Sequence, residues 1–159
     1  MRYHLIWAGA TLALVIAACG GSSPASQASP KSSCVNAGAP HHAYVVVEHL
    51  SGASVQRCVG FAGETIDGQA LMDQSGIEYQ AQTYSFGKGV CQVDNEPAQY
   101  TVCFPPNQPS WALFLETAGA WALASGAYNK ASLHDKEALG WHYVQSTDAN
   151  PAPPPLAEH

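Results

Sequence analysis

Cysteines are the residues of this chain whose type and spacing most clearly indicate chemistry. Five are present, and four of them follow one another at wide intervals: Cys34, Cys58, Cys91 and Cys103. No C-x-x-C pair occurs, which argues against a zinc site and against a thioredoxin-type redox site. An even number of cysteines in an exported chain favours disulfides. The spacing favours Cys91–Cys103 and Cys34–Cys58, while pairing of Cys58 with Cys91 or Cys103 remains open.

The fifth cysteine, Cys19, closes an apolar segment at the N-terminus. Arg2 precedes the apolar run Leu5–Ala18, and this arrangement is typical of a secretory signal that is too short to span a bilayer. The last four residues, Ile16-Ala17-Ala18-Cys19, resemble the acceptor motif of bacterial lipoproteins. We therefore expect residues 1–18 to be a signal peptide. Lipid on Cys19 would then anchor the chain outside the cytoplasm, in the cell membrane or the outer membrane.

Two polar segments flank the expected domain, which covers residues 41–145. Residues 19–40 are rich in Gly, Ser, Pro and Ala, without apolar periodicity, and predict a lipidated flexible tether. Residues 146–159 contain the sequence NPAPPPLAEH and predict a disordered Pro/Ala tail.

The charge pattern limits the classes of partner. Charged residues make up 11% of the chain and the net charge is −6. The few Lys and Arg residues are scattered singly, so we expect no nucleic-acid partner. The expected partners are the membrane, through the lipid anchor, and a small-molecule ligand or a transporter subunit.

Catalytic residues are not marked by any motif. Ser110, His134 and Asp135 are the three residue types of a Ser/His/Asp triad, but no G-x-S-x-G nucleophile motif occurs in the sequence. We therefore expect no enzyme and no catalytic residues.

The densest group of metal-ligating residue types is His41, His42, Glu48 and His49. If a strand begins at His41, the side chains of the two adjacent histidines point to opposite faces and cannot share one ion. We expect neither a metal site nor a cofactor.

Aromatic residues are the best candidates for ligand contact. A stacking platform for a planar or ring-bearing ligand could use Tyr84, Phe86, Trp111, Trp121, Trp141 and Tyr143. Core packing is the alternative role for the three tryptophans. Tyr84 and Phe86 lie in an expected loop, Tyr84–Gly89, where Gly87 and Gly89 would allow movement, so we expect these two rings to be exposed.

The elements that must position these residues are mainly strands. Alternating and β-branched patterns predict strands at 43–49, 54–61, 77–83, 90–93, 99–104, 110–116, 120–124 and 138–145. One short helix follows residue 65, with Thr65 or Asp67 as N-cap and Gly76 as left-handed C-cap. The predicted fold class is α+β, a disulfide-bonded, β-grasp-like mixed sheet with one short helix.

An ordered set of short motifs is similar to a family of bacterial exported proteins of unknown function, which is related to the C-terminal domain of transcobalamin and intrinsic factor. The set covers about residues 43–145 and comprises Arg57-Cys58-Val59-x-Phe61, Gly68–Leu71, Ser75-Gly76, Val90-Cys91-x-Val93, Cys103-Phe104, Trp111, Gly119-x-Trp121, Gly126-Ala127 and Gly140-Trp141. The resemblance implies a β-grasp-like domain and, as its ligand, a molecule such as cobalamin.

Two functions follow from these observations. The first is a non-catalytic surface lipoprotein whose domain binds a small molecule, such as cobalamin, or serves as a transporter accessory. The second is a structural or adhesive module that contacts a protein or polymer at the cell surface. A closed aromatic pocket near Tyr84–Lys88 and Trp111 would favour the first function, and a flat exposed sheet edge the second.

Overall fold

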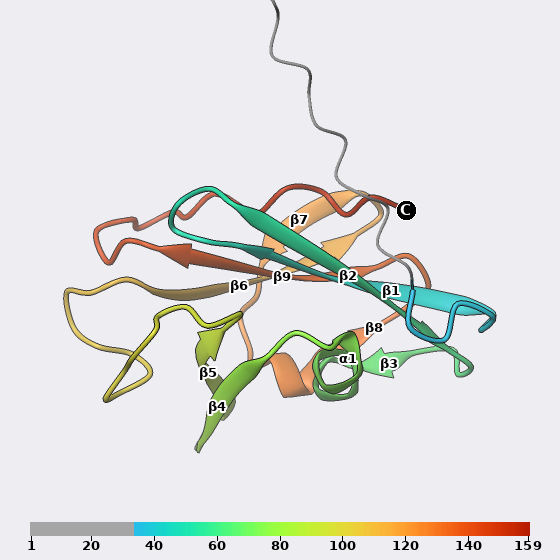
Figure 1. Ribbon diagram of the computed structural model, residues 1–159, viewed down its shortest axis with the longest axis horizontal. Helices are drawn as coiled ribbons and strands as arrows, with labels where there is room; N and C mark the ends of the chain where they lie inside the picture. Colours follow the sequence, from blue (N-terminus) through green and yellow to red (C-terminus); the bar gives the residue numbers. More distant parts are fainter. Residues whose placement is uncertain (1–33) are drawn as a thin grey trace, which may run out of the picture. The chain divides into compact units, whose positions relative to one another are not determined.

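The computed structural model describes residues 34–159, so the expected signal peptide, Cys19 and most of the expected tether lie outside the described residues. Its main element is a five-stranded sheet in the order β2-β1-β9-β6-β7 (Figure 1). The strands are β1 (His41–Glu48), β2 (Ser54–Phe61), β6 (Ser110–Thr117), β7 (Ala120–Leu123) and β9 (Ala138–Val144). The central pair, β1 and β9, is parallel, and the other neighbours are antiparallel.

The inner face of this sheet packs against the helix α1 (Gly68–Ser75). Side chains alternate across a strand, so Val45 and Val47 of β1 point to this face and are fully buried with Leu71 and Met72 of α1. The Asp67 carboxylate accepts a hydrogen bond from the Ala70 backbone N–H and caps the helix at its N-terminus. At the other end the helix closes on Gly76, in the left-handed conformation, as predicted.

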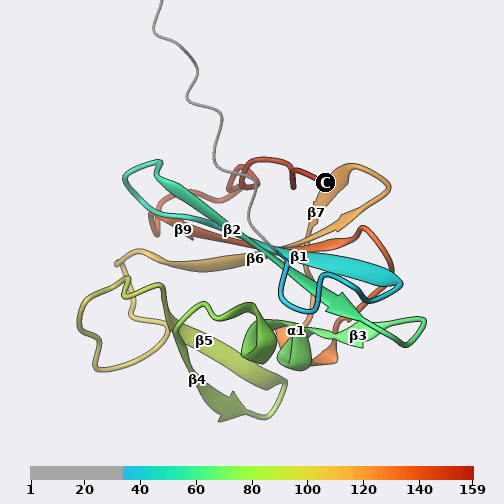
Figure 2. The same cartoon turned by 45° about the vertical axis from the view of Figure 1, so that its right-hand side comes forward.

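Two small sheets complete the inner layer. One pairs β3 (Ile66–Asp67) with β8 (Ser132–Leu133), next to the 3-10 helix η1 (Tyr128–Lys130). The other is a hairpin of β4 (Tyr79–Tyr84) and β5 (Gly87–Val93). Two views place this hairpin and α1 on the same side of the five-stranded sheet (Figures 1 and 2).

The partner of β5 differs from the expected one. We expected 99–104 to run back beside Val90–Val93, but these residues form an irregular loop, and β5 pairs with β4 instead. Pro97 and Pro105 border the segment and limit strand pairing on either side. The expected loop at 84–89 is correspondingly shorter, because both strands extend to a two-residue turn at Ser85 and Phe86.

Both disulfides have the pairing that the spacing favours, Cys34–Cys58 and Cys91–Cys103. The first attaches residues 34–40 to β2, where the Val35 N–H donates to the Cys58 carbonyl at 2.9 Å. This part of the expected flexible tether is therefore packed against the sheet. The second disulfide attaches the irregular loop to β5. Two disulfides are typical of a domain that resides outside the cytoplasm.

The segment 146–159 also differs from expectation, because it lies along the outer face of the main sheet and does not project from it (Figures 1 and 2). Ala157 is buried, and its N–H donates to Glu116 Oε2 at 3.2 Å. Gln56 exchanges two hydrogen bonds with the backbone of Glu158, at 2.6 and 2.8 Å. The C-terminal segment makes these contacts with backbone groups and the small residue Ala157. Hydrophobic periodicity in the sequence therefore does not predict them.

The structure thus confirms the α+β class with a mixed, β-grasp-like sheet, one short α-helix and two disulfides. Within residues 34–159, no helix combines the length and hydropathy needed to cross a membrane.

Candidate functional site

Three aromatic rings gather at the end of the β4–β5 hairpin, and we call Tyr84, Phe86 and Phe104 the aromatic surface. The rings of Tyr84 and Phe86 are stacked, with centroids 5.2 Å apart and an interplanar angle of 6°. Phe104 lies 5.5 Å from Tyr84 and is tilted by 54°. Phe86 is 56% exposed and Phe104 is 47% exposed. The expectation that Tyr84 and Phe86 lie at the surface therefore agrees with the structure, although Tyr84 is only partly exposed.

Gly89 explains how the rings can lie so close to the backbone of β5. A Cβ atom at this position would stand 2.6 Å from Phe104 Cζ and 3.0 Å from Tyr84 Cε2. The glycine therefore provides space for two of the three rings. Its role is close packing, whereas the sequence suggested loop movement.

A row of polar side chains continues from the aromatic surface along the hairpin. Because side chains alternate, Gln80, Gln82 and Tyr84 share one face of β4. The Tyr84 hydroxyl donates to Gln82 Oε1 at 3.1 Å. At the other end, Tyr100 OH donates to Gln80 Oε1 at 2.6 Å, and Gln80 Nε2 donates to Gln92 Oε1 at 3.0 Å. We call Gln80, Gln82, Gln92 and Tyr100 the amide row.

Trp111 and Tyr143, two other predicted ligand residues, belong to the core. Trp111 is 7% exposed, and its indole N–H donates to the Glu96 carbonyl at 2.9 Å. Its ring packs 4.8 Å from that of Tyr143. Burial, and then the charge of Glu96, raises the pKa of the Tyr143 hydroxyl.

Trp141 and Trp121 lie on opposite faces of the main sheet. Trp141 is 3% exposed on the inner face, where its N–H points at Met72 Sδ. Trp121 is partly buried on the outer face, and its ring lies over Gly140. The indole N–H of Trp121 has no hydrogen-bond partner among the described residues. The six predicted aromatic residues therefore do not form one site, and only Tyr84 and Phe86 belong to the aromatic surface.

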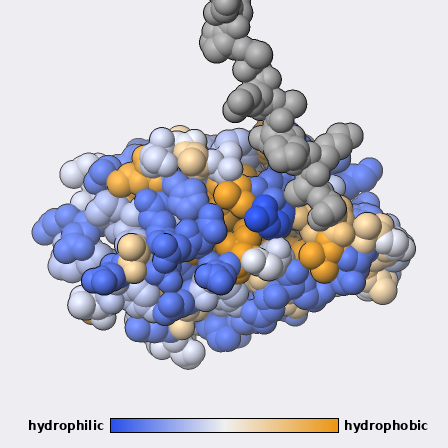
Figure 3. Space-filling view, in the orientation of Figure 1, coloured by the Kyte–Doolittle hydropathy of each residue, from blue (hydrophilic) through white to orange (hydrophobic). Residues whose placement is uncertain are grey.

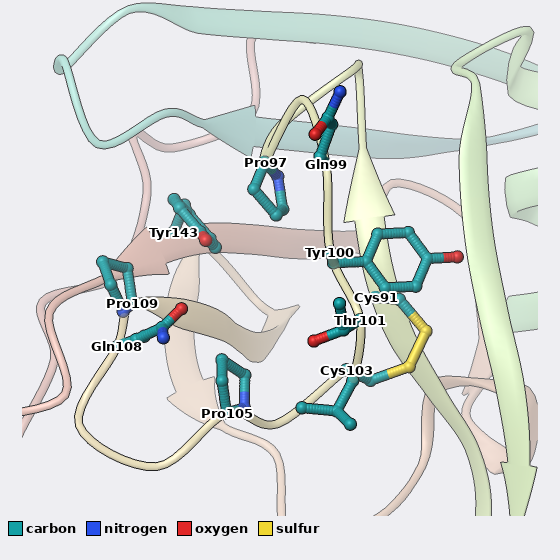
Figure 4. Close-up of a pocket in the computed structure, with 11 residues that line it drawn as sticks. Cys91, Pro97, Gln99, Tyr100, Thr101, Cys103, Pro105, Gln108, Pro109 and Tyr143 are labelled. Atoms are coloured by element: carbon teal, nitrogen blue, oxygen red, sulfur yellow. A yellow bond between two sulfur atoms is a disulfide. The ribbon is translucent and has the colours of Figure 1, made fainter.

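A small pocket lies beside the Cys91–Cys103 disulfide (Figure 4). It is bordered by Pro97, Tyr100, Pro105 and Tyr143 and has a volume of ≈ 80 Å³. Pockets that bury small ligands usually measure about 300–1,000 Å³. The pocket is therefore too small to enclose a ligand the size of cobalamin.

The serine, histidine and acid considered for catalysis do not meet. Ser110 pairs with Val144 at one end of β9, while His134 and Asp135 precede its other end, about 20 Å away at the rise of a strand. Asp135 accepts a hydrogen bond from the His42 N–H at 2.8 Å, and this bond lowers the pKa of its carboxyl group.

Metal-ligating side chains do not form a cluster of three or more that could hold an ion anywhere in residues 34–159. His49, which follows β1, lies between two carboxylates. Its two ring nitrogens contact Glu96 Oε2 at 2.8 Å and Asp94 Oδ2 at 3.1 Å. These contacts connect the end of β1 to the turn that follows β5.

The arrangement defines an α+β domain with an exposed aromatic and amide surface on one hairpin. No family model and no curated protein matches the sequence. Among solved structures, the chain is similar to a crystal structure from Ruminococcus gnavus ATCC 29149 described as a "putative metal binding protein". The identity is 13%, the TM-score is 0.49, and the alignment covers 66% of this chain and 97% of the other. A similarity of this level assigns neither a family nor a function.

Proposed function

We propose that this protein is a non-catalytic binding module, held outside the cytoplasm by lipid on Cys19, and that the aromatic surface is its ligand-contact site. The observation that carries the proposal is the exposure of Phe86 and Phe104 in a domain that buries Trp111 and Trp141. Burial of an aromatic side chain is worth about 1.5–3 kcal/mol. A group of rings that stays in contact with water is therefore typical of an interaction site.

The hairpin that carries these rings favours an open surface contact over an enclosed ligand. The pocket of ≈ 80 Å³ lies beside Cys91, and Tyr84 and Phe86 do not line it. In the described part of the chain β4 pairs only with β5, and its residues Gln80 to Thr83 are exposed. These features favour the structural or adhesive role, in which a macromolecule contacts the hairpin, over capture of a small molecule such as cobalamin. A transporter subunit is one such macromolecule.

The face of the molecule drawn in Figure 3 is mostly hydrophilic and carries small, separate hydrophobic patches. Among the exposed large hydrophobic residues, Phe86 and Phe104 lie together at the hairpin end, whereas Leu123 lies on β7. Isolated exposed residues are ordinary, whereas a cluster indicates an interface.

Photo-crosslinking tests the proposal. A benzophenone side chain inserts into C–H bonds of proteins, sugars and lipids alike, so it reports contact with any class of ligand. We expect the benzophenone residue placed at Phe86 to give a crosslinked product of higher mass in intact cells. The same residue placed at Leu123, which is 57% exposed on β7, is the control. Equal yields at the two positions, or no product at Phe86, would refute the proposal.

A further inference from the structure

The aromatic surface and the amide row lie in a part of the chain that is almost free of charge. Between Tyr79 and Pro109 the charged residues are Lys88, Asp94 and Glu96. The two acids contact His49 at the turn after β5, at 3.1 and 2.8 Å. Recognition of phosphates, nucleic acids or anionic lipids depends on clustered cations. Lys88 and Lys130 of η1, which follows the Asn129 that accepts from the Lys88 N–H, do not supply such a cluster, so the charge pattern favours an uncharged ligand.

The amide row offers both donors and acceptors to a ligand. A glutamine amide has two N–H donors and an oxygen acceptor. Gln82 is exposed, and its amide nitrogen has no hydrogen-bond partner within residues 34–159. The amides of Gln80 and Gln92 are oriented by a chain of hydrogen bonds that ends at the Pro97 carbonyl, at 2.6 Å. Groups fixed before binding lose less conformational entropy when a ligand arrives.

Combined, the two surfaces match the chemistry of a sugar ring, which has an apolar C–H face and a rim of hydroxyl groups. The C–H face packs on an aromatic ring, and each hydroxyl both donates and accepts hydrogen bonds. We infer that the ligand of this site is a neutral polysaccharide, bound on the exposed ring of Phe86, which stacks on Tyr84, and along the glutamines of β4. This inference rests on the proposed function and names its ligand class.

The shape of the site indicates a polymer and not a single sugar. Gln80, Gln82 and Tyr84 occupy alternate positions of β4, so the face from Gln80 to Tyr84 is about 13 Å long at the rise of a strand. This face lies on an exposed strand and its residues do not line the pocket, so it can contact internal units of a long chain. A protein strand that pairs with the free edge of β4 is a different class of partner, and the experiment distinguishes it.

Native affinity electrophoresis of the full chain tests the inference. The gels contain hydroxyethylcellulose, xylan, galactomannan or glycol chitin as neutral probes, and alginate as an anionic probe. We expect at least one neutral polymer to retard the protein more than alginate does. The change Phe86→Ala should weaken that interaction about tenfold, the equivalent of about 1.4 kcal/mol, and Gln82→Ala about threefold. Leu123→Ala, an equally exposed residue on β7, should leave the mobility unchanged.

Retardation by none of the neutral polymers, or equal retardation of the Phe86→Ala and unchanged proteins, would overturn the inference. The crosslinking experiment then separates the two proposals. A product whose added mass glycosidases leave intact, and whose tryptic peptides include those of a second protein, would keep the binding function and replace the polysaccharide with a protein. A missing product together with missing retardation would refute both. Equal melting temperatures of the variants show that any loss of binding is local.

Discussion

Gly89→Ala is a substitution that should reduce binding much more than stability. The added Cβ would stand 2.6 Å from Phe104 Cζ and 2.7 Å from Phe104 Cε2, so either the backbone at residue 89 or the Phe104 ring must move. Phe104 is nearly half exposed and its ring can rotate into solvent. Overpacking in a closed core costs about 1–3 kcal/mol, but here the strain is released at the surface. Replacing a glycine by alanine also stabilises the folded state by about 0.4–1 kcal/mol, because the unfolded chain loses conformational entropy. We therefore expect a net change of less than about 1 kcal/mol.

Urea unfolding measures the stability of the Gly89→Ala protein, and affinity electrophoresis measures its binding to the polysaccharide. The Gly89→Ala protein should keep its unfolding midpoint within the range of ordinary surface variants and lose retardation about as Phe86→Ala does, because Phe104 no longer packs on Tyr84. Gly126→Ala is the matched control, since its Cβ would meet nothing within 4 Å. A loss of 3 kcal/mol or more would show that Phe104 has a structural role. Unchanged binding would remove Phe104 from the site.

Three further predictions concern the anchor, the C-terminal segment and pH. Cys19→Ala should move the protein from the membrane fraction to the soluble fraction, and retention in the membrane would contradict the lipid anchor. Ala157→Asp should destabilise by about 1–3 kcal/mol, because it places a carboxylate next to buried Glu116. The exposed Leu156→Asp should have little effect in the same urea titration, and equal effects would mean that the segment does not pack. Burial, and then a hydrogen bond to a carboxylate, raises the pKa of Tyr79. Its contribution to stability is therefore complete below the unfolded pKa of about 10 and is lost as pH rises towards the folded value. Tyr79→Phe should flatten the alkaline part of the stability curve, and identical curves would refute the assignment.

The main sheet could be predicted because local sequence and tertiary position agree there. Val45, Val46 and Val47 favour a strand on propensity alone, and both faces of β1 are buried, so nothing opposes that preference. Asp67 and Gly76 mark the helix ends by the chemistry of their caps. The segment 99–104 fails for the opposite reason. Its Tyr, Thr, Val and Phe residues have high strand propensity, but they pair with no strand in the structure. Strand propensity does not show whether a neighbouring strand is available for pairing.

The candidate site was only half predictable. Tyr84 and Phe86 could be assigned to the surface because they lie in an expected glycine-containing loop, and loops lie at the surface. Phe104 was missed because it was placed in a strand, although its neighbour Pro105 indicated a loop. The tryptophans Trp111 and Trp141 were included because their residue type suits both cores and ligand sites. Their burial and the partners of their N–H groups, the Glu96 carbonyl and Met72 Sδ, show that both belong to the core.

The Cys91–Cys103 disulfide is the part of the fold that positions Phe104 in the aromatic surface. It joins β5 to the irregular loop at the residue preceding Phe104, so it holds that ring beside Tyr84 without any strand pairing. By the chain-entropy account, a closed loop of this size is worth about 3 kcal/mol. The main core lies between α1 and the five-stranded sheet and includes neither cysteine. The aromatic surface therefore depends for the position of Phe104 on a buried crosslink that lies outside the main hydrophobic cluster.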